Sequence, residues 1–501
     1  MAKPLDLLLV SPPSRDLVFQ ALGKNLTAIE MPVWSTLMAT FFQNGGYSVR
    51  ILDAEAHGMS FDATAKAIVE AQAVLTVFVV YGHQPSASTQ CMPAGRAVCN
   101  LVKQEAPYLS TLVMGTHASA LPRRTLAEEP YDFVCEGEGP YTILGLLELL
   151  KSGSQNFGRV PGLWYFQGGQ ICSNPVADNI QDLTRELHGQ AWDLLDVSKY
   201  RAHNWHCFEH IEERQPYASL QTSLGCPYKC SFCCINAPFG GAGIRYWSPH
   251  LLIDQLDILV NKYSVRNLKI PDEMFVLNEK HVIGLCDLII ERNYPLNIWA
   301  YSRVDTVKDR FLEKLKKAGF NWLALGIESG SKYVRDGVDK GRFKDSDILK
   351  ITQKIKDHGI NIVANFIFGL PDDTQESMQD TLELAAEINA EWANFYCAMA
   401  YPGSFLYTRA KKLGLPLPDS ENGPGWIGYS QHAYETLPLP TETLSGVEVL
   451  KFRDEAFNKY FSNPCYVNMV GQKFGPRVIE HIHDMLNCKI KRRFHDMVSS
   501  S

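Results

Sequence analysis

The sequence predicts an α/β protein in three parts: an N-terminal doubly wound domain, a partial parallel (β/α) barrel, and a C-terminal, mostly helical cap. Short apolar runs alternate with helix-length segments before residue 151 and again from residue 217. These runs are nearly continuously apolar, as is typical of parallel strands that are buried on both faces. Residues 406–501 break the alternation with aromatic, proline-punctuated sequence followed by helical periodicity.

The first domain, residues 1–151, contains five predicted strands with helices between them. The strands are expected at 5–10, 47–54, 73–80, 110–115 and 132–137, and the helices at 34–44, 61–72, 86–105 and 138–151. Five such units form a Rossmann-like sheet that binds ligands at the carboxyl ends of its strands. The first strand is followed by "SPPSRD" and not by GxGxxG, which argues against a classical dinucleotide site.

A connector and a barrel follow. Residues 152–216 contain a hairpin pattern around Gly168-Gly169, and residues 217–405 resume the alternation. Strands are expected at 217–223, 267–273, 296–303, 321–330, 361–371 and 392–403, with helices at 248–262, 278–291, 308–318, 345–358 and 373–388. Reactive groups in such barrels lie at the carboxyl ends of the strands.

Composition narrows the class of protein. Hydrophobic residues make up 46% of the chain and charged residues 21%, as in soluble globular proteins. The net charge of −7 gives no basic excess to neutralise phosphates, so we expect no nucleic-acid partner. The first apolar run is only about six residues long and ends at a double proline, which predicts a buried strand and not a signal peptide or membrane span. We expect a cytoplasmic protein; its oligomeric state is not indicated.

Four of the 13 cysteines lie within residues 226–234, "CPYKCSFCC". A disulfide framework is disfavoured in the reducing cytoplasm. A structural zinc site normally has four ligands in two pairs, and no second pair follows. Three thiolates from one loop, Cys226, Cys230 and Cys233, fit a four-iron, four-sulfur cluster whose fourth iron is open to another ligand. Cys234 is expected to be a small buried hydrophobe.

This CxxxCxxC loop, with Phe232 before its last cysteine, resembles the radical S-adenosylmethionine (SAM) enzymes. Further motifs occur in the order of that family: "PDEMF" (271–275), "YSRVD" (301–305), "GIESGS" (326–331), "FIFGLP" (366–371) and "AYPGSFLY" (400–407). The resemblance implies that the open iron of the [4Fe-4S] cluster chelates SAM. Electron transfer from the cluster, supplied by an external donor of the flavodoxin or ferredoxin type, would then generate a 5′-deoxyadenosyl radical.

The first domain also resembles a known type. "LLLVSPP" (7–13), "LDAEAHGMS" (52–60), "GTHASALP" (115–122) and "CEGEGP" (135–140) are similar to the cobalamin-binding domain that precedes the barrel in one radical SAM class. The two resemblances cover about residues 1–410. Cobalamin domains with a histidine ligand carry DxHxxG, and "DAEAHGM" (53–59) lacks that spacing. Cobalamin would therefore bind base-off, without histidine on cobalt.

The barrel motifs carry candidate SAM-binding residues. Asp272 or Glu273 is expected to accept hydrogen bonds from the SAM amino group, although carboxylates at strand ends also cap helices or face solvent. The next strand ends in Ser302 and Arg303; the arginine could hold the SAM carboxylate or form an ion pair at the barrel mouth. Glu328 is expected to face the ribose or the substrate, or to act near a helix N-cap.

Two other barrel residues are assigned by the resemblance. Phe232 would form a wall beside the adenine, or would simply fill core. Gly369, in "Gly369-Leu370-Pro371", would form a tight turn near the adenine and act through its backbone.

In the first domain, predicted strand ends would surround the corrin. The candidate residues are Pro12, Pro13, Ser14, Gly115, Thr116, His117, Glu136, Gly137 and Glu138. His57 and His83 are candidate metal ligands by residue type, but single histidines in loops are more often solvated or hydrogen-bonded.

The resemblance implies a two-cofactor enzyme. One SAM would yield the radical that removes hydrogen from an unactivated carbon of a small-molecule substrate, methylcobalamin would deliver a methyl group, and a second SAM would remethylate the cobalt. One alternative is a cyclase, rearrangement or dehydration enzyme of the same architecture, with or without cobalamin. A second alternative is a non-catalytic iron–sulfur or corrin-binding protein.

Overall fold

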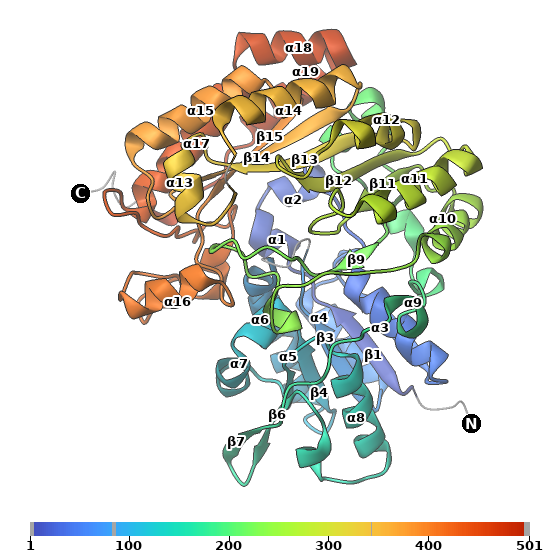
Figure 1. Ribbon diagram of the computed structural model, residues 1–501. Helices are drawn as coiled ribbons and strands as arrows, with labels where there is room; N and C mark the ends of the chain where they lie inside the picture. The colour runs from blue at the N-terminus through green and yellow to red at the C-terminus, as the bar shows by residue number, and fades with distance from the viewer. Residues whose placement is uncertain (1–4, 83–86, 342, 495–501) are drawn as a thin grey trace.

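The computed structural model describes residues 5–82, 87–341 and 343–494, and it consists of two sheets that face each other across an interface (Figure 1). The first sheet is below in Figure 1 and the second above, with the C-terminal helices packed over the second. None of the described helices combines the length and the apolarity that crossing a bilayer requires.

The first sheet has the strand order β2-β1-β3-β4-β5-β6-β7. Strands β1 to β5 are parallel, and β6 and β7 are antiparallel. The strands are β1 (Leu7–Ser11), β2 (Val49–Asp53), β3 (Leu75–Val79), β4 (Thr111–Met114), β5 (Phe133–Cys135), β6 (Leu163–Gln167) and β7 (Gln170–Ser173). The chain reverses its direction of strand addition between β1 and β3, and ligands of doubly wound sheets bind in that crevice.

Helices cover both faces of this sheet. They are α3 (Val33–Asn44), α4 (Phe61–Ala71), α5 (Ser88–Glu105) and α8 (Pro140–Lys151), together with the short α1 (Arg15–Phe19), α2 (Leu22–Asn25), α6 (Thr116–Ala120) and α7 (Pro122–Glu128). The five parallel strands and four long helices confirm the sequence prediction. The four short helices were not predicted, because each has too few residues for a hydrophobic period to be recognised.

The hairpin predicted around Gly168-Gly169 forms as β6 and β7, and it extends the first sheet by pairing with β5. Part of the segment expected to be a connector is therefore continuous with the first sheet. The rest contains α9 (Leu183–Glu186) and short 3-10 turns, which lead into the second sheet.

The second sheet is a curved, all-parallel half-barrel with the order β15-β14-β13-β12-β11-β8. Its strands are β8 (Tyr217–Ser219), β11 (Asn267–Ile270), β12 (Asn297–Arg303), β13 (Phe320–Glu328), β14 (Asn361–Phe368) and β15 (Trp392–Cys397). The helices between them are α10 (Pro249–Tyr263), α11 (Glu279–Arg292), α12 (Asp309–Lys317), α13 (Lys332–Gly337), α14 (Asp345–Asp357) and α15 (Gln375–Ile388). The predicted partial barrel is confirmed.

The C-terminal part is helical, as predicted. It contains α16 (Phe405–Lys412), α17 (Gly446–Phe461), α18 (Pro464–Phe474) and α19 (Pro476–Asn487), with the 3-10 helix η7 (Trp426–Tyr429). Helix α17 packs on β15 and α15. The arginine of "KFRDE" supports this packing, because Arg453 is buried and donates to the Phe395 carbonyl at 2.7 Å.

The two sheets belong to one packed body, and charged pairs cross between them. Glu138, after β5, binds Arg245 at 2.7 Å, and Arg245 lies in β10 (Arg245–Tyr246), which pairs with β9 (Ser223–Leu224) ahead of the cysteine loop. Glu30, between α2 and α3, binds Lys269 of β11 at 3.2 Å. Buried hydrophobic residues from both halves form one continuous core. These contacts fix the first domain against the barrel mouth.

Candidate active site

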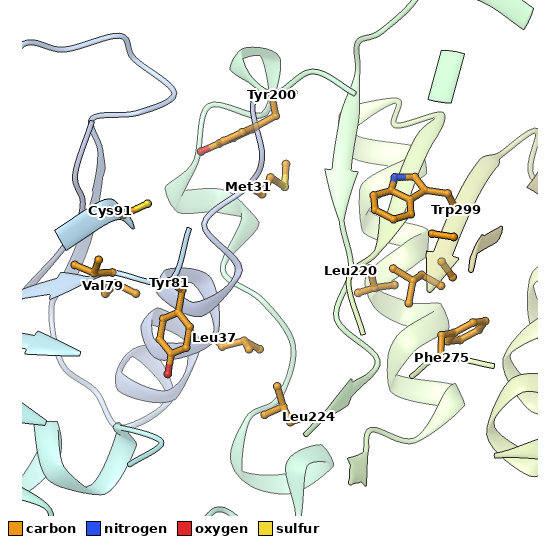
Figure 2. Close-up of a cluster of buried hydrophobic side chains, with 14 of the residues drawn as sticks. Met31, Leu37, Val79, Tyr81, Cys91, Tyr200, Leu220, Leu224, Phe275 and Trp299 are labelled. Carbon is orange, nitrogen blue, oxygen red and sulfur yellow. The ribbon is translucent and has the colours of Figure 1, made fainter. Parts of the chain in front are cut away.

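A cavity of about 180 Å³ lies between the two sheets, where the carboxyl edge of the first faces the mouth of the half-barrel. Figure 2 shows Val79, Tyr81 and Cys91 on the side of the first domain and Leu224 and Trp299 on the barrel side. The described residues that line the cavity are Ser11, Pro12, Ser14, Glu30, Met31, Pro32, Val33, Trp34, Ser35, Asp53, Glu55, Val79, Val80, Tyr81, Gly82, Cys91, Ser219, Gln221, Leu224, Gly225, Ile235, Phe239, Lys269, Pro271, Glu273 and Tyr301.

The cysteine loop begins at the cavity, directly after β9. Gly225 has a φ of +89°, and a Cβ there would lie 2.5 Å from the Gly243 carbonyl, so glycine is needed for this close approach. Asn236 holds the loop at two points. Its Oδ1 accepts from the Cys226 amide at 3.3 Å, and its Nδ2 donates to the Tyr228 carbonyl at 3.2 Å.

The three motif cysteines differ in exposure. Cys226 is buried, Cys230 is half-buried and Cys233 has exposed surface. Burial nevertheless raises the pKa of the Cys233 thiol well above its usual value. Burial also raises the pKa of Cys226 to about 11. Cys234 is buried, as expected for a small hydrophobe.

No group of three or more His, Cys, Asp or Glu residues in the described chain is arranged to hold a single metal ion. A four-iron cluster places its thiolates on separate irons and so requires them farther apart.

Arg303, at the end of β12, lies beside this loop. Its Nη1 is 3.4 Å from the Cys230 sulfur, and its guanidinium lies 4.0 Å from the centre of the Tyr228 ring. The same guanidinium binds Asp305 at 2.9 and 3.1 Å and donates to the Lys340 carbonyl. The structure thus shows the barrel-mouth ion pair, and it places a permanent positive charge next to one motif thiol.

Glu328, at the end of β13, forms a buried ion pair with Lys340 at 2.5 Å. Its φ is +69°, an uncommon conformation for a non-glycine residue, and a β-bulge lies between Gly326 and Glu328. The bulge turns the carboxylate toward Lys340. This pairing was not anticipated, because the lysine follows in a separate loop that has no secondary-structure pattern.

Asp272 and Glu273 have different surroundings although they are adjacent. Asp272 is completely buried and accepts hydrogen bonds from the Thr222 amide (2.7 Å), the Thr222 hydroxyl (2.5 Å) and the Ser223 hydroxyl (2.6 Å). Glu273 lines the cavity, and its carboxylate has no hydrogen-bond partner among the described residues. Burial raises the pKa of Asp272 to about 6 and that of Glu273 to about 8.

The remaining barrel candidates lie around the mouth. Phe232 packs against Val334, Val338, Leu370 and Ala398, so it does fill core at the ends of the later strands. Gly369 has a φ of +78°, and a Cβ there would lie 2.5 Å from Val449 of α17, while its amide donates to Asp373 at 2.9 Å. Ser302 is buried, and its hydroxyl has no hydrogen-bond partner in the described part of the chain.

In the first domain, the loop after β1 reaches the cavity. Pro12 and Ser14 line it, and Pro13 is half-buried beside them. Glu55 fixes the loop, because its carboxylate accepts from the Ser14 amide at 2.6 Å and the Arg15 amide at 3.0 Å.

The candidates after β4 do not line the cavity. Gly115 allows close backbone packing, since a Cβ there would lie 2.1 Å from the Val80 carbonyl. Thr116 is buried. His117 is also buried, with its ring centre 4.4 Å from that of Trp426.

The candidates after β5 also lie outside the cavity lining and contact protein groups. Glu136 accepts from Trp164 at 2.6 Å, the Gly137 amide donates to Ser119 at 3.2 Å, and Glu138 binds Arg245.

His57 is exposed, and its Nδ1 lies 2.8 Å from the Asp53 carbonyl, which fits the expectation of a hydrogen-bonded loop histidine. His83 lies outside the described residues.

The structure therefore brings together Cys226, Cys230, Cys233, Glu273 and Arg303, whose charges act on one another. Sequence reasoning missed several residues that shape the site: Glu30, Trp34, Tyr81, Lys269 and Lys340. The available signal was weak. Only the lysine within "NLKIPDE" stood out, as a charge inside an otherwise apolar strand.

Two family models match the chain. The B12 binding domain model matches residues 20–147, and the Radical SAM superfamily model matches residues 220–385. The two matches correspond to the first sheet with its helices and to the half-barrel.

Similar proteins match both halves together. An uncharacterised methyltransferase of Pyrococcus horikoshii is 27% identical, over 81% of this chain and 83% of that protein. An anaerobic magnesium-protoporphyrin IX monomethyl ester cyclase of Rubrivivax gelatinosus is 26% identical, over 93% of this chain and 80% of that protein.

Among solved structures, that of the radical SAM methyltransferase TsrM from Kitasatospora setae, with cobalamin and a [4Fe-4S] cluster bound, has the same fold. Its TM-score is 0.67 at 15% identity, over 92% of this chain and 90% of that one. The order of domains, the cysteine loop at the barrel mouth and the family models agree: the chain combines a B12 binding domain with a Radical SAM superfamily domain that follows it.

Proposed function

We propose that this protein is a cobalamin-dependent radical SAM methyltransferase that acts on an unactivated carbon of a small molecule. One observation carries the proposal: the crevice of the first sheet and the cysteine-loop side of the barrel open into the same cavity. Groups held at these two sides would reach one substrate from opposite directions. When bound, the cluster, SAM and cobalamin together supply a substrate radical and the methyl group that it receives.

The cysteine loop suits an iron–sulfur cluster. Cys226, Cys230 and Cys233 provide three thiolates, and the Arg303 guanidinium beside Cys230 would offset part of their negative charge. Asn236 and Gly225 fix the loop backbone independently of the sulfurs. The thiolates are thus held by a loop whose shape is already set by the protein.

For SAM, the free carboxylate at the cavity is Glu273. An ionised Glu273 would bind an ammonium group by a charge-assisted hydrogen bond. Asp272 is committed to Thr222 and Ser223, and it acts by fixing the segment that leads into the cysteine loop. We therefore assign the amino-group contact to Glu273. Arg303 and the unpartnered hydroxyl of Ser302 remain the proposed neighbours of the SAM carboxylate.

For cobalamin, the lining on the side of the first domain has the required character. Tyr81 follows β3 at the crevice and stacks on Trp34, with ring centres 4.4 Å apart. Its hydroxyl is buried and has no hydrogen-bond partner among the described residues, which suits a ligand that brings polar side groups.

The apolar lining would also protect a radical. The apolar part of the cavity lining includes Trp34, Val79, Leu224, Ile235 and Phe239. Of these side chains, only the Trp34 indole can donate a hydrogen bond. Exclusion of water from the cavity is what such chemistry requires of the protein.

A cyclase is the second candidate, because the Rubrivivax gelatinosus cyclase aligns over nearly the whole chain. The test is anaerobic turnover of the reconstituted enzyme with methyl-deuterated SAM and a flavodoxin-type reductant. An extract of the cells in which the enzyme naturally occurs serves as the source of substrate. Methyl transfer predicts 5′-deoxyadenosine and S-adenosylhomocysteine in similar amounts, together with a CD3-labelled product. Extract-dependent 5′-deoxyadenosine without S-adenosylhomocysteine would reject the methyltransferase and favour the cyclase.

The corrin is tested separately by the absorption spectrum of protein that is produced with cobalamin available. A base-off spectrum that is unchanged in His57→Ala is expected. A protein that carries no corrin at all would contradict the assignment of the first domain.

A further inference from the structure

The cavity has a marked imbalance of charge. Lys269 is its only cationic residue among the described lining residues, whereas Glu30, Asp53, Glu55 and Glu273 are acidic. Whether the cavity accepts an anionic substrate therefore depends on whether the Lys269 ammonium is available.

The Lys269 ammonium is already matched by a carboxylate. It lies 3.2 Å from Glu30, and both side chains are about 95% buried, with exposed fractions of 4% and 6%. Glu30 is held for this contact by the hydroxyls of Tyr217 (2.6 Å) and Ser219 (3.2 Å). On its other side, Lys269 lies 5.0 Å from the centre of the Trp299 ring. A substrate anion would have to displace Glu30 from a buried, hydrogen-bonded position.

The surroundings disfavour negative charge for a second reason. Burial raises the pKa of Glu55 to about 7 and that of Glu273 to about 8, so even the resident carboxyl groups are hard to ionise there. A further carboxylate or phosphate would lose its hydration, would meet these acids and would find no unpaired cation.

The rest of the lining is suited to an uncharged molecule. Apart from the Tyr81–Trp34 wall proposed for cobalamin, the apolar lining includes Met31, Pro32 and Val33 on the first-domain side and Leu224, Ile235 and Phe239 on the barrel side. The barrel floor has the neutral polar groups of Ser219, Gln221 and Tyr301. We infer that the substrate of this enzyme is a largely apolar molecule without an anionic group, held at one end by a hydroxyl or carbonyl that hydrogen-bonds to the barrel floor. This inference rests on the proposed function and names the substrate class of the same site.

The test compares two probes that share one naphthalene ring system, 2-naphthol, which is neutral at pH 7, and 2-naphthoate, which is anionic. Their binding to the reconstituted holoenzyme is measured by equilibrium dialysis without turnover. The wild type is expected to bind the neutral probe at least about tenfold more tightly. Phe239→Ala should weaken naphthol binding, because Phe239 lines the cavity outside the wall proposed for cobalamin.

The discriminating variant is Glu30→Gln, which keeps the shape of the side chain and removes the carboxylate charge that faces the Lys269 ammonium. It should strengthen naphthoate binding by about tenfold and leave naphthol binding nearly unchanged. Glu129→Gln is the matched control, because Glu129 is a buried carboxylate paired with Arg96 at 2.6 Å outside the cavity. It should leave the preference between the probes as in the wild type.

Equal binding of both probes to the wild type would overturn the inference. So would an absence of naphthol binding, or naphthol binding that Phe239→Ala does not change. If Glu30→Gln does not fold, the wild-type comparison still decides. Because binding is read without SAM cleavage, a failure here is separate from a failure of methyl transfer, which is read from the two SAM-derived products.

Discussion

Replacement of Asp272 by alanine should destabilise the protein and empty the cysteine loop of iron. The carboxylate is completely buried, and it receives hydrogen bonds from one amide and two hydroxyls at 2.5–2.7 Å. The Thr222 hydroxyl also lies 2.9 Å from His281 Nε2, so the loss would extend to that ring. These groups lie in and just before β9, which leads directly into the cysteine motif.

The expected loss of stability follows from the hydrogen-bond donors of Thr222 and Ser223 that Asp272→Ala would leave unpaired. A hydrogen bond to a charged group contributes about 1.5–3 kcal/mol, and stranding a buried donor costs about 1–3 kcal/mol. Since the three bonds share one carboxylate, they do not add, and the loss of a buried charged network of this size costs about 3–5 kcal/mol. Asp272→Ala should therefore lower the free energy of unfolding by about 3–5 kcal/mol in urea denaturation of the apoprotein.

The neighbouring carboxylate supplies the control. Glu273→Ala removes a side chain without hydrogen-bond partners among the described residues, so the free energy of unfolding at neutral pH should stay the same or rise. Iron content after reconstitution should fall in Asp272→Ala and be retained in Glu273→Ala, whereas SAM affinity should fall in Glu273→Ala. The reasoning is refuted if Asp272→Ala is as stable as the wild type and loses only SAM affinity, because Asp272 would then be the SAM-binding residue.

Two further predictions concern the same region. The combined alanine variant of Cys226, Cys230 and Cys233 should lose the brown iron–sulfur chromophore and SAM cleavage. Cys234→Ala is the control and should keep nearly all of its iron. A wild type that contains no iron but a tightly bound zinc would contradict the assignment of an iron–sulfur cluster. The second prediction follows from the pKa of Glu273, which burial raises from 4.5 to about 8. Ionisation of Glu273 then opposes folding, so the free energy of unfolding is highest at low pH and declines as pH rises from about 4.5 to 8. At about 1.4 kcal/mol per pH unit, the decline is at most about 5 kcal/mol. Glu273→Gln should be the more stable form at pH 9 and match the wild type near pH 4.5 in urea denaturation; parallel curves would show that Glu273 is not the cause.

The strands of both sheets could be predicted because parallel, doubly covered strands are nearly continuously apolar. The choice between Asp272 and Glu273 could not. Strand β11 ends at Ile270, and beyond a strand the alternation of faces no longer says which side chain points inward. The ion pair of Glu328 with Lys340 depends on a β-bulge and on a positive φ at Glu328, and the sequence "GIESGS" predicts neither of them. Glu30 lies in a loop without a motif, and its role depends on the docking of two domains.

The contact between Glu138 and Arg245 has a consequence for attempts to recombine such enzymes. The arginine lies in β10, which follows the cysteine loop and pairs with β9 on the other side of it, and its carboxylate partner belongs to the other domain. The position of the cysteine loop is therefore partly set by residues that a transplanted first domain would have to bring with it. A chimaera joined within the connector would need acidic residues equivalent to both Glu138 and Glu30, because without them Arg245 and Lys269 would lose their carboxylate partners across the interface. The two halves are best exchanged together, as a single cassette.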